Sequence, residues 1–404
     1  MLALEAVFWL SAALIVWTQL GYAAALAAAA RVLPAASSGP RDRSRRSRSK
    51  SSPQDAYGDA TPAGSLPALS LILAAHDEHT VIGERVANAL ALDYPRELLE
   101  VIVACDGCTD ATAERAREAG ADLVLELPRG GKIAAQDAAV ERSRGDVVAF
   151  SDANAAWAPD AARQLVRAFE DPRVGYACGQ VRYVGSQHGA DANQEGVYWR
   201  YELAVRALES RLSSITAGNG AIYATRRTSY IVVDPIMGHD LSLPFNIVKR
   251  GLRAVYVPTA LSTEKMVPSL VGEFARKRRM MSHTWPIVVR GGMLSPRGYT
   301  PGYALMIVSH RLLRYSTPML HAVALAANIA LVALAGGSAQ ALYAVTLALQ
   351  LALLLAAALA GALPLRPLLV ARYYVLTTAS LAAGLYDWLR HGTAATWEVA
   401  EGTR

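Results

Sequence analysis

The sequence predicts an α/β domain with a mostly parallel sheet, held at a membrane by one helix before the domain and about three helices after it. Only 18% of the 404 residues are charged and 53% are hydrophobic, whereas a soluble domain usually carries about a quarter charged residues. No Asp, Glu, Lys or Arg occurs from Ala6 to Ala30 or from Ser316 to Leu365. Between these stretches, short apolar runs alternate with amphipathic ones, as strands and helices do in parallel sheets.

The stretch from Ala6 to Ala30 is long enough for a membrane-spanning helix, which needs about 20 apolar residues. A signal peptide is the alternative, but it usually starts with basic residues, and the only early charge here is Glu5. We therefore expect a retained anchor over residues 1–32. Residues 33–65, rich in Arg, Ser, Pro and Gly, predict a disordered basic linker. Positive charge after a span marks the cytoplasmic side and attracts anionic membrane lipids.

The uncharged stretch from Ser316 to Leu365 is too long for one helix and contains two adjacent glycines, so it predicts a hairpin of two spans. A third candidate, from Pro367 to Leu389, carries charges near its ends, where long side chains reach the interface. Four spans in all place the carboxyl terminus outside the cell. The expected segments are an interfacial helix at 301–315, transmembrane helices at 316–390 and a C-terminal tail at 391–404.

Charge and cysteine content exclude several classes of protein. The net charge of +6 is modest and partly local, so nucleic acid is not an expected partner. The three cysteines, Cys105, Cys108 and Cys178, exclude a disulfide framework and suit a reducing compartment. The Cys105 and Cys108 pair also allows a redox motif, but that interpretation leaves the acidic residues described below unexplained. A transporter is disfavoured because the apolar segments are almost all Ala, Leu and Val.

Within the central domain, the first segments alternate between strand and helix. Continuous runs of Leu, Ile and Val indicate strands that are buried on both faces. Ligands of such sheets bind at the carboxyl ends of the strands, so the loops after the strands are the places to search for a site. The expected elements are strands at Leu69–Ala75, Leu99–Ala104 and Val147–Ser151, and helices at Val81–Ala91 and Ala111–Glu118.

Acidic residues follow all three predicted strands. Glu78 lies after the first strand, Asp106 and Asp110 after the second, and Asp152 after the third. A single acid at such a place is commonly a helix cap or a turn residue, and we expect this of Asp110. Acids after three neighbouring strands converge on one crevice. We therefore expect Asp106 and Asp152, each at a strand end, to contact a ligand.

These residues carry a family resemblance. In order, the chain shows Glu78, Asp106-Gly107-Cys108-Thr109-Asp110, Gly130-Gly131-Lys132, Asp152-Ala153-Asn154 and Gly238-His239-Asp240. This order resembles the family-2 glycosyltransferases of the GT-A fold, a nucleotide-sugar-binding domain. The resemblance covers about Leu69 to Pro318, and Gly218 to Tyr223 resembles the membrane-embedded polysaccharide-synthase branch. It implies a GT-A glycosyltransferase domain over residues 66–300.

The resemblance also implies how a donor is held. Glu78 and Asp106 would hold the base and ribose of a nucleotide-diphosphate sugar, because carboxylates accept hydrogen bonds from both. Lys132 would meet the diphosphate as a point charge. Asp152 would bind a divalent cation, Mg²⁺ or Mn²⁺. Asn154 stands where the family usually has Asp, which lowers metal affinity or leaves Asn154 to contact the sugar. Asn219 is expected to contact substrate as well.

On the acceptor side, Asp240 matches the general base that removes the proton from the attacking hydroxyl. Attack from the face opposite the diphosphate inverts the anomeric centre. The alternative for Asp240 is a cap for a helix from Leu241 onward, which Pro244 argues against. His239 replaces the acid that the family usually has before the base.

Processive relatives show Gln, two free positions and then Arg-Trp, and this chain has Arg276 at the first of these positions and Arg279 at the fourth. Arginines at these positions can clamp phosphate through two hydrogen bonds. Met280 replaces the tryptophan of processive relatives, and Trp285 is the candidate substitute. His310 and Arg311 are expected at the membrane interface.

The resemblance implies a multi-pass protein of the inner membrane with a cytoplasmic catalytic domain. Its activity would be that of an inverting, metal-dependent, hexosyltransferase-type enzyme that transfers sugar to a lipid-linked or cell-envelope glycan. A processive exopolysaccharide synthase is the alternative within the family. A non-catalytic, nucleotide-sugar-binding membrane scaffold is the alternative of another class, because Asn154, His239 and Met280 depart from the usual pattern.

Overall fold

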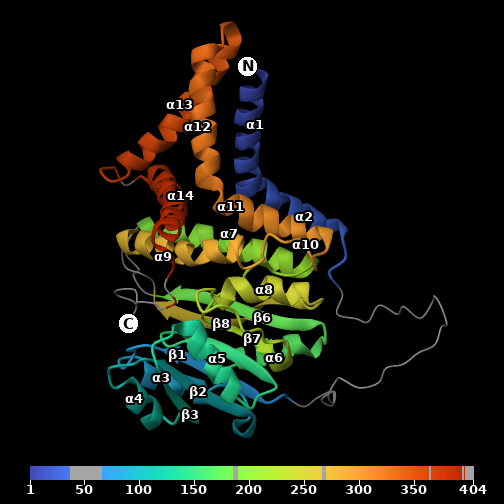
Figure 1. Ribbon diagram of the computed structural model, residues 1–404, viewed down its shortest axis with the longest axis vertical. Helices are drawn as coiled ribbons and strands as arrows, with labels where there is room; N and C mark the ends of the chain where they lie inside the picture. Colours follow the sequence, from blue (N-terminus) through green and yellow to red (C-terminus); the bar gives the residue numbers. More distant parts are fainter. Residues whose placement is uncertain (37–65, 185–189, 266–269, 364, 394, 396–404) are drawn as a thin grey trace, which may run out of the picture.

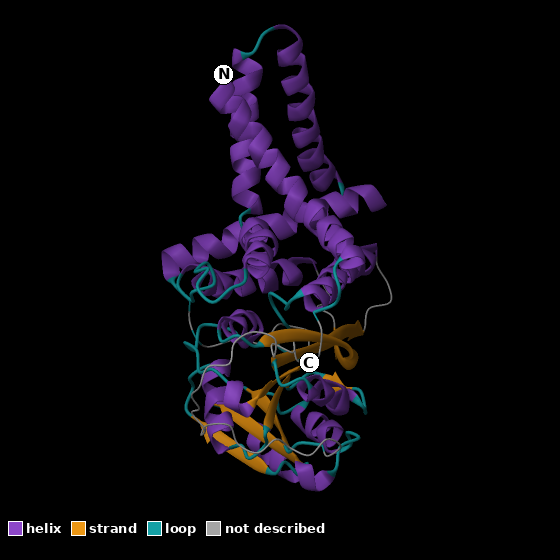
Figure 2. Cartoon of the chain, turned by 90° about the vertical axis from the view of Figure 1, so that its right-hand side faces the viewer, coloured by secondary structure: helices purple, strands orange, loops and turns teal. Residues whose placement is uncertain are grey.

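The computed structural model describes residues 1–36, 66–184, 190–265, 270–363, 365–393 and 395. It has three tiers (Figure 1): a sheet domain at one end, long helices at the other end, and a layer of helices lying across between them. Figure 2 shows the same tiers from the side, with all strands in the sheet domain. Most of the predicted linker and of the predicted C-terminal tail lies outside the described residues.

The sheet domain contains eight strands in the order β3-β2-β1-β4-β7-β6-β8-β5. Strands β3, β2, β1 and β4 are parallel, as are β6 and β8, whereas β7 and β5 pair antiparallel with their neighbours. The predicted mostly parallel α/β fold is confirmed. The strands are β1 (Leu69–Ala75), β2 (Leu99–Asp106), β3 (Leu123–Leu127), β4 (Val147–Asp152), β5 (Ala156–Trp157), β6 (Val174–Val184), β7 (Tyr223–Arg226) and β8 (Arg253–Lys265).

The central strands are buried on both faces. In β1, Leu71 and Leu73 pack in one core cluster with residues of α3, α4 and α6, while Ile72 packs in a second cluster with residues of α5 and α8. This double burial is why the sequence shows continuous apolar runs instead of alternation. The helices are α3 (Ile82–Leu90), α4 (Thr112–Glu118), α5 (Lys132–Arg142), α6 (Ala161–Arg167) and α8 (His239–Lys249). Short 3₁₀ turns are η2 (Arg96–Leu98), η3 (Ala168–Glu170) and η4 (Arg227–Ser229).

The strand order reverses beside β1. Strands β1, β2 and β3 follow one another toward one edge, and β4 then pairs with the other side of β1. Ligands of open α/β sheets bind at such a switch point, outside the carboxyl ends of the strands. Asp106 is the last residue of β2 and Asp152 is the last residue of β4. The fold therefore brings both predicted ligand-contacting acids to the edge where a ligand is expected.

The middle tier consists of α7 (Ala190–Leu212), α9 (Leu270–Val289) and a broken helix made of α10 (Pro301–Met306), η5 (Ile307–Leu312) and α11 (Leu313–Tyr315). The broken helix covers the segment that was expected to lie at the membrane interface. His310 and Arg311, however, are buried, at 2% and 7% exposure. The expected interfacial position of these two side chains is wrong, because Glu202 and Glu209 of α7 lie beside them and pair with the histidine.

The N-terminal helix changes direction before it reaches the middle tier. Helix α1 (Leu2–Val16) continues through the π-helical turn η1 (Trp17–Gly21) into α2 (Tyr22–Val32), and a π turn is a recognised cause of a helix kink. Helix α2 then runs along the middle tier (Figure 1) and contacts α7. Trp17 Nε1 donates to Ser309 Oγ at 3.0 Å. The segment before the kink is therefore the part available to cross a membrane.

Four helical segments are long and apolar enough to cross a membrane, one N-terminal and three C-terminal, as predicted. They are Leu2–Val32, α12 (Thr317–Leu334), α13 (Gly337–Leu359) and α14 (Arg366–His391). Helix α14, however, packs along α9. Arg278 donates to both carboxylate oxygens of Asp387, at 2.5 and 2.6 Å, and Thr393 Oγ1 donates to the carbonyl of Ser282 at 2.7 Å.

The end of α14 therefore lies on the side of the sheet domain. The carboxyl terminus itself lies outside the described residues, but the contacts of α14 count against its expected place across the membrane from the domain. Hydropathy does not weigh these polar contacts: besides the Asp387 pair, Lys277 of α9 donates to Tyr373 and Thr377 of α14, at 2.7 and 3.3 Å. These contacts hold α14 against the middle tier.

We expect an epitope tag at the carboxyl terminus to share the accessibility of the sheet domain, because the end of α14 lies against α9. Protease added to sealed vesicles of uniform orientation should cut both or spare both, whereas a tag before Met1 should behave in the opposite way. The placement is contradicted if the C-terminal tag and the sheet domain differ in protection.

Candidate active site

Asp106 organises the glycine turn that leads into α5. Its side chain is 1% exposed, and its Oδ1 accepts from the backbone N–H of Gly130 at 2.6 Å and of Gly131 at 3.0 Å. Gly131 has φ of 95°, which residues with a Cβ rarely adopt. The turn places Lys132 at the first position of α5. Asp106 thus has a structural task, and its expected contact with the nucleoside stays a prediction.

Lys132 lies among three carboxylates. Its ammonium contacts the carboxylate of Asp152. Burial would lower the pKa of Lys132, but Asp152, Asp240 and Glu264 raise it above its usual value. Gly220 leaves room for the pair, since a Cβ there would lie 3.3 Å from Lys132 Nζ and 3.6 Å from Asp152 Oδ2. The start of α5, the end of β4, the start of α8 and the end of β8 therefore meet in one charged cluster.

Asp240 lies in the first turn of α8, and the expectation that Pro244 prevents a helix here is wrong, because α8 continues through it. Proline has no N–H, so the carbonyl four residues earlier, that of Asp240, loses its helical donor. The N–H of Gly218 donates to that carbonyl instead, at 2.6 Å. Burial raises the pKa of the Asp240 carboxyl, although Lys132 opposes the shift. A raised carboxyl pKa suits proton acceptance near neutral pH.

His239 points into the core and not toward an acid partner. Its side chain is 2% exposed, with Nδ1 at 3.0 Å from the hydroxyl of Tyr223 and Nε2 at 3.3 Å from that of Tyr230. Phe150 stacks on Tyr223, with ring centroids 4.7 Å apart, and contacts His239 edge-on. Burial, assisted by the charge of Lys132, lowers the pKa of His239 to about 3. The imidazole therefore stays neutral at physiological pH.

Glu264 is the member of the cluster that the sequence analysis missed. Burial raises its pKa to about 7; Asp152 adds to the shift, while Lys132 and Arg276 oppose it. The two antiparallel pairings around β7 return β6, and with it β8, to the direction of β4. The carboxyl end of β8 therefore lies at the same edge as Asp152. An acid near a strand end was the signal that could have identified it.

Glu78 and Asp110 secure the loops at the edge of the crevice. The N–H of Glu78 donates to Thr112 Oγ1 at 2.8 Å, and its carbonyl accepts from Ile82 at the start of α3. Asp110 accepts from the N–H of Thr112 at 3.0 Å and from His79 Nδ1 at 2.6 Å. Asp110 thus caps the start of α4, as expected. The carboxyl of Glu78 is 8% exposed, and its nucleoside contact stays a prediction.

Asn154 and Asn219 have different surroundings. Asn154 is half-buried in the turn that follows β4, two residues beyond Asp152. Asn219 is 9% exposed; its Nδ2 donates to the carbonyl of Gly179 at 2.8 Å, and its Oδ1 accepts from Ala221 and Ile222 at 3.1 and 2.9 Å. These bonds fix the loop before β7. The substrate contact expected of Asn219 stays a prediction beside this structural role.

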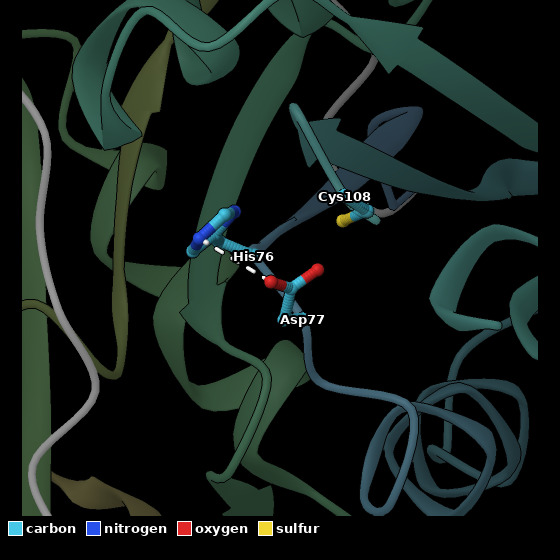
Figure 3. A group of neighbouring side chains, drawn as sticks. All are labelled: His76, Asp77 and Cys108. Atoms are coloured by element: carbon cyan, nitrogen blue, oxygen red, sulfur yellow. Dashed lines mark ion pairs between the residues drawn. The ribbon is translucent and has the colours of Figure 1, made fainter. Parts of the chain in front are cut away.

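A separate group of possible metal ligands lies across the crevice. Figure 3 shows His76, Asp77 and Cys108, whose ligand atoms lie within 4.8 Å of one another, the one such trio in the described part of the chain. Asp77 Oδ1 accepts from the N–H of Thr109 at 2.7 Å, and His76 Nδ1 lies 2.8 Å from the carbonyl of Asp106. A thiolate suits softer metals, whereas Mg²⁺ and Mn²⁺ prefer oxygen. The trio therefore does not fit the predicted cation, and Asp152 fits it better.

A pocket of about 410 Å³ opens beside the end of β2. Its lining includes Gly107, Thr109 and Glu126, and also Cys105 and Cys108. A volume of this size falls within the range of small-molecule sites. The pocket adjoins Asp106, where the nucleoside is expected.

Helix α9 carries the two arginines that are expected to lie on the acceptor side. Arg276 lies near Glu264, whose pKa it lowers, and Arg279 is half-buried one turn further on. The neighbouring Lys277 and Arg278 bind α14 and do not face the inner leaflet as a free basic surface. Trp285 is 5% exposed and donates to a carbonyl of α14. Trp285 therefore packs two helices together, and the expectation that it replaces the missing tryptophan is wrong.

The chain is similar to known proteins in sequence and in fold. The family described as Glycosyl transferase family 2 matches residues 70–231. An N-acetylglucosaminyltransferase of Rhizobium sp. (strain N33) is 26% identical over 231 residues, 52% of this chain and 51% of that protein. The beta-monoglucosyldiacylglycerol synthase of Nostoc sp. is 34% identical over 119 residues, 28% of this chain and 25% of that protein.

The chain spans about half the length of the N-acetylglucosaminyltransferases that it matches. Among solved structures, a mannosyltransferase from Pyrobaculum calidifontis in complex with GDP-Man and Mn²⁺ is similar, with a TM-score of 0.66 and 22% identity. That similarity covers 96% of this chain and 99% of the other. It shows that the fold is shared.

We expect His239 to make the folded protein less stable in acid. Its pKa of about 3 lies below the 6.5 of a free histidine, so the unfolded chain takes up a proton that the folded chain does not. Its contribution to stability should be complete above about pH 6.5 and fall as the pH drops toward 3. Melting temperatures of the detergent-solubilised protein from pH 7.5 to 4.5 measure this slope.

The matched variants are His239→Gln, which should flatten the slope, and His283→Gln on α9, which should keep it. Equal slopes for wild type and His239→Gln would contradict the assignment.

Proposed function

Residues 70–231 form a glycosyl transferase family 2 domain, and from this premise we propose that the protein is a membrane-bound inverting glycosyltransferase. It moves a sugar from a nucleotide-diphosphate donor to a lipid-linked or cell-envelope glycan. The observation that supports this most directly is the cluster of Lys132, Asp152 and Asp240 at the carboxyl edge of the sheet. A cation for phosphate, a carboxylate for metal and a buried base share one crevice.

The donor end of the crevice is built from the turn before α5. Lys132 is the positive charge nearest Asp152, and it starts a helix whose free backbone N–H groups also favour phosphate. The carboxylate of Asp106 holds that turn by accepting hydrogen bonds from the backbone N–H groups of Gly130 and Gly131. A diphosphate at this place would be neutralised by Lys132, while the nucleoside would extend toward Asp106 and Glu78. The half-buried Asn154 is then positioned to contact the donor sugar.

A divalent cation fits the donor set. Asp152 supplies a hard carboxylate oxygen, and burial together with the charge of Asp152 raises the pKa of the neighbouring Glu264 to about 7. Asp152 would hold the cation together with oxygens of the diphosphate, with Glu264 close enough to add charge. When bound, Mg²⁺ or Mn²⁺ would stabilise the negative charge of the departing nucleotide.

The transfer itself depends on Asp240. Its carboxylate would take the proton of the acceptor hydroxyl while that oxygen attacks the anomeric carbon and the bond to the diphosphate breaks. Burial raises the pKa of Asp240, so its carboxylate is a stronger base than one in water. Lys132 keeps enough of it ionised to act. As the family resemblance implies, the attack would come from the face opposite the leaving diphosphate and would invert the configuration.

The acceptor is proposed to reach the crevice from the membrane side. Arg276 of α9 lies beside the cluster, and α9 is joined to α14 through Arg278 and Asp387. A glycan on a lipid anchored in the inner membrane could therefore present its hydroxyl to a cytoplasmic domain. The similarity to a synthase of a glucosylated diacylglycerol is consistent with a lipid acceptor. Arg279, half-buried on the same helix, would bind a lipid phosphate.

We expect Asp240→Asn to lower transfer by roughly a hundredfold to ten-thousandfold, because a positioned general base is lost. Donor binding should survive, since Lys132 and Asp152 remain. Purified protein is screened with a panel of nucleotide sugars and membrane lipid extract, and nucleotide release, donor binding and product mass are measured. The matched control is Asp234→Asn, an exposed acid in the loop before α8.

Near-normal turnover of Asp240→Asn would refute the base assignment. Donor binding without nucleotide release in the wild type would favour a non-catalytic scaffold. Long chains made from donor alone would favour the processive synthase.

We expect excess chelator to abolish transfer and Mg²⁺ or Mn²⁺ to restore it. Asp152→Ala should raise the Mn²⁺ concentration needed for half-maximal activity at least tenfold and weaken Mn²⁺ binding in the presence of nucleoside diphosphate, as followed by electron paramagnetic resonance. Asp160→Ala, an exposed acid at the start of α6, is the control. Full activity in chelator, or an unchanged Mn²⁺ response of Asp152→Ala, would exclude this role.

A further inference from the structure

A buried ionic cluster lies in the middle tier, outside the crevice. Glu202 and Glu209 lie two turns apart on α7, and His310 of η5 lies between them. His310 Nδ1 is 2.7 Å from Glu209 Oε1, and its Nε2 is 3.5 Å from Glu202. Arg314 pairs with Glu202 and donates to His310 Nε2 at 3.2 Å. Each of these residues is at most 8% exposed.

Charges buried this deeply are retained only when they are paired. Burial would raise the pKa of Glu202, but Arg314 and His310 hold it well below its usual range. Burial opposes the same shift at Glu209, where His310 and Arg311 keep the pKa low. Both carboxylates are therefore ionised and available as strong hydrogen-bond acceptors.

The cluster holds the segment that follows α7. Glu209 Oε2 accepts from the N–H of Thr216 at 3.0 Å, and Arg311 Nε donates to Thr216 Oγ1 at 2.8 Å. The hydroxyl of Tyr303 donates to the carbonyl of Ile215 at 3.0 Å. Side chains from two helices of the middle tier thus hold Ile215 and Thr216 by three hydrogen bonds, two to the backbone and one to the Thr216 hydroxyl.

Two residues further on, the same backbone reaches Asp240. The carbonyl of Gly218 accepts from Arg206 Nη2 at 3.0 Å, and its N–H donates to the Asp240 carbonyl that Pro244 leaves without a helical donor. A Cβ on Gly218 would lie 2.1 Å from the hydroxyl of Tyr176, so this position has no room for a side chain. The next glycine of this loop, Gly220, lies against Lys132, as described above.

The N-terminal anchor closes the cluster from the membrane side. The hydroxyl of Tyr22, just after the kink, donates to Glu209 Oε1 at 2.7 Å. The helix that crosses the membrane is therefore connected to the candidate base by Tyr22, Glu209, Thr216, Gly218 and Asp240, and every link is a hydrogen bond or a short stretch of backbone.

We propose that this buried cluster positions Asp240, so that Tyr22, Glu209 and Thr216 are positioning residues for transfer and the membrane anchor supports the base. The inference rests on the proposed function, since it concerns the orientation of the proposed base. The cluster would then orient Asp240 in addition to joining helices. Loss of one link should misplace the base while the donor subsite around Lys132 remains intact.

Tyr22→Phe and Thr216→Val each remove one hydroxyl and keep the shape of the side chain. Both should lower kcat about tenfold, because small displacements of a reacting group are costly, and donor KM should stay within about twofold. Thr216→Ser, which keeps the hydroxyl, should restore most of kcat. Trp17→Phe is the matched control: it breaks the bond to Ser309 from the same helix but does not touch Glu209, so its kcat should equal that of the wild type.

Hydrogen exchange of the peptides containing Gly218 and Asp240 provides a second readout that needs no activity. Exchange should be faster in Tyr22→Phe and Thr216→Val than in Trp17→Phe at equal thermal stability. Unchanged kcat and exchange, or an equal loss of kcat in Trp17→Phe, would overturn the proposal. If no donor supports transfer, the proposed function fails, while the exchange data still decide whether the cluster holds the Gly218 loop.

Discussion

The contact between Lys132 and Asp152 is the interaction on which the rest of the crevice depends. The parallel directions of β4 and β8, together with the start of α8, bring the carboxyls of Asp152, Asp240 and Glu264 to one edge. Carboxylates gathered in a half-buried place disfavour one another's charge, and Lys132 offsets this repulsion. The lysine is held there by the turn that Asp106 stabilises at Gly130 and Gly131. A residue at the end of β2 thereby sets the charge balance beside β4.

The parallel half of the sheet could be predicted from the sequence because its strands are buried on both faces. Continuous apolar runs mark such strands clearly, and Asp106 and Asp152 follow as the polar residues at their ends. Glu264 could not be placed in this way. Its position depends on two antiparallel pairings that restore the direction of β8, and the local pattern of the strand does not show those pairings.

The buried ionic cluster of the middle tier could not be predicted from the sequence for a related reason. Charged residues within a helix usually indicate a solvated face, and Glu202, Glu209 and His310 are far apart in sequence or on different helices. These charged side chains can be buried only because they pair with one another. The same limit explains α14: its composition fits a spanning helix, but Tyr373 and Asp387 bind basic residues of α9. A hydropathy average cannot register a few specific polar contacts, and these decide where the chain goes.

Asp106 and Asp240 of the crevice have different roles because their surroundings differ. Asp106 gives its carboxylate oxygens to backbone N–H groups of the glycine turn and is fixed by them. Asp240 is attached to the scaffold through its backbone carbonyl, which Pro244 leaves available to Gly218. Its carboxyl therefore does not have to serve as the anchor, and burial can raise its pKa toward the range in which a base is effective. A proline that argued against a helix in the sequence thus allows the fold to hold the residue firmly while leaving its reactive group for chemistry.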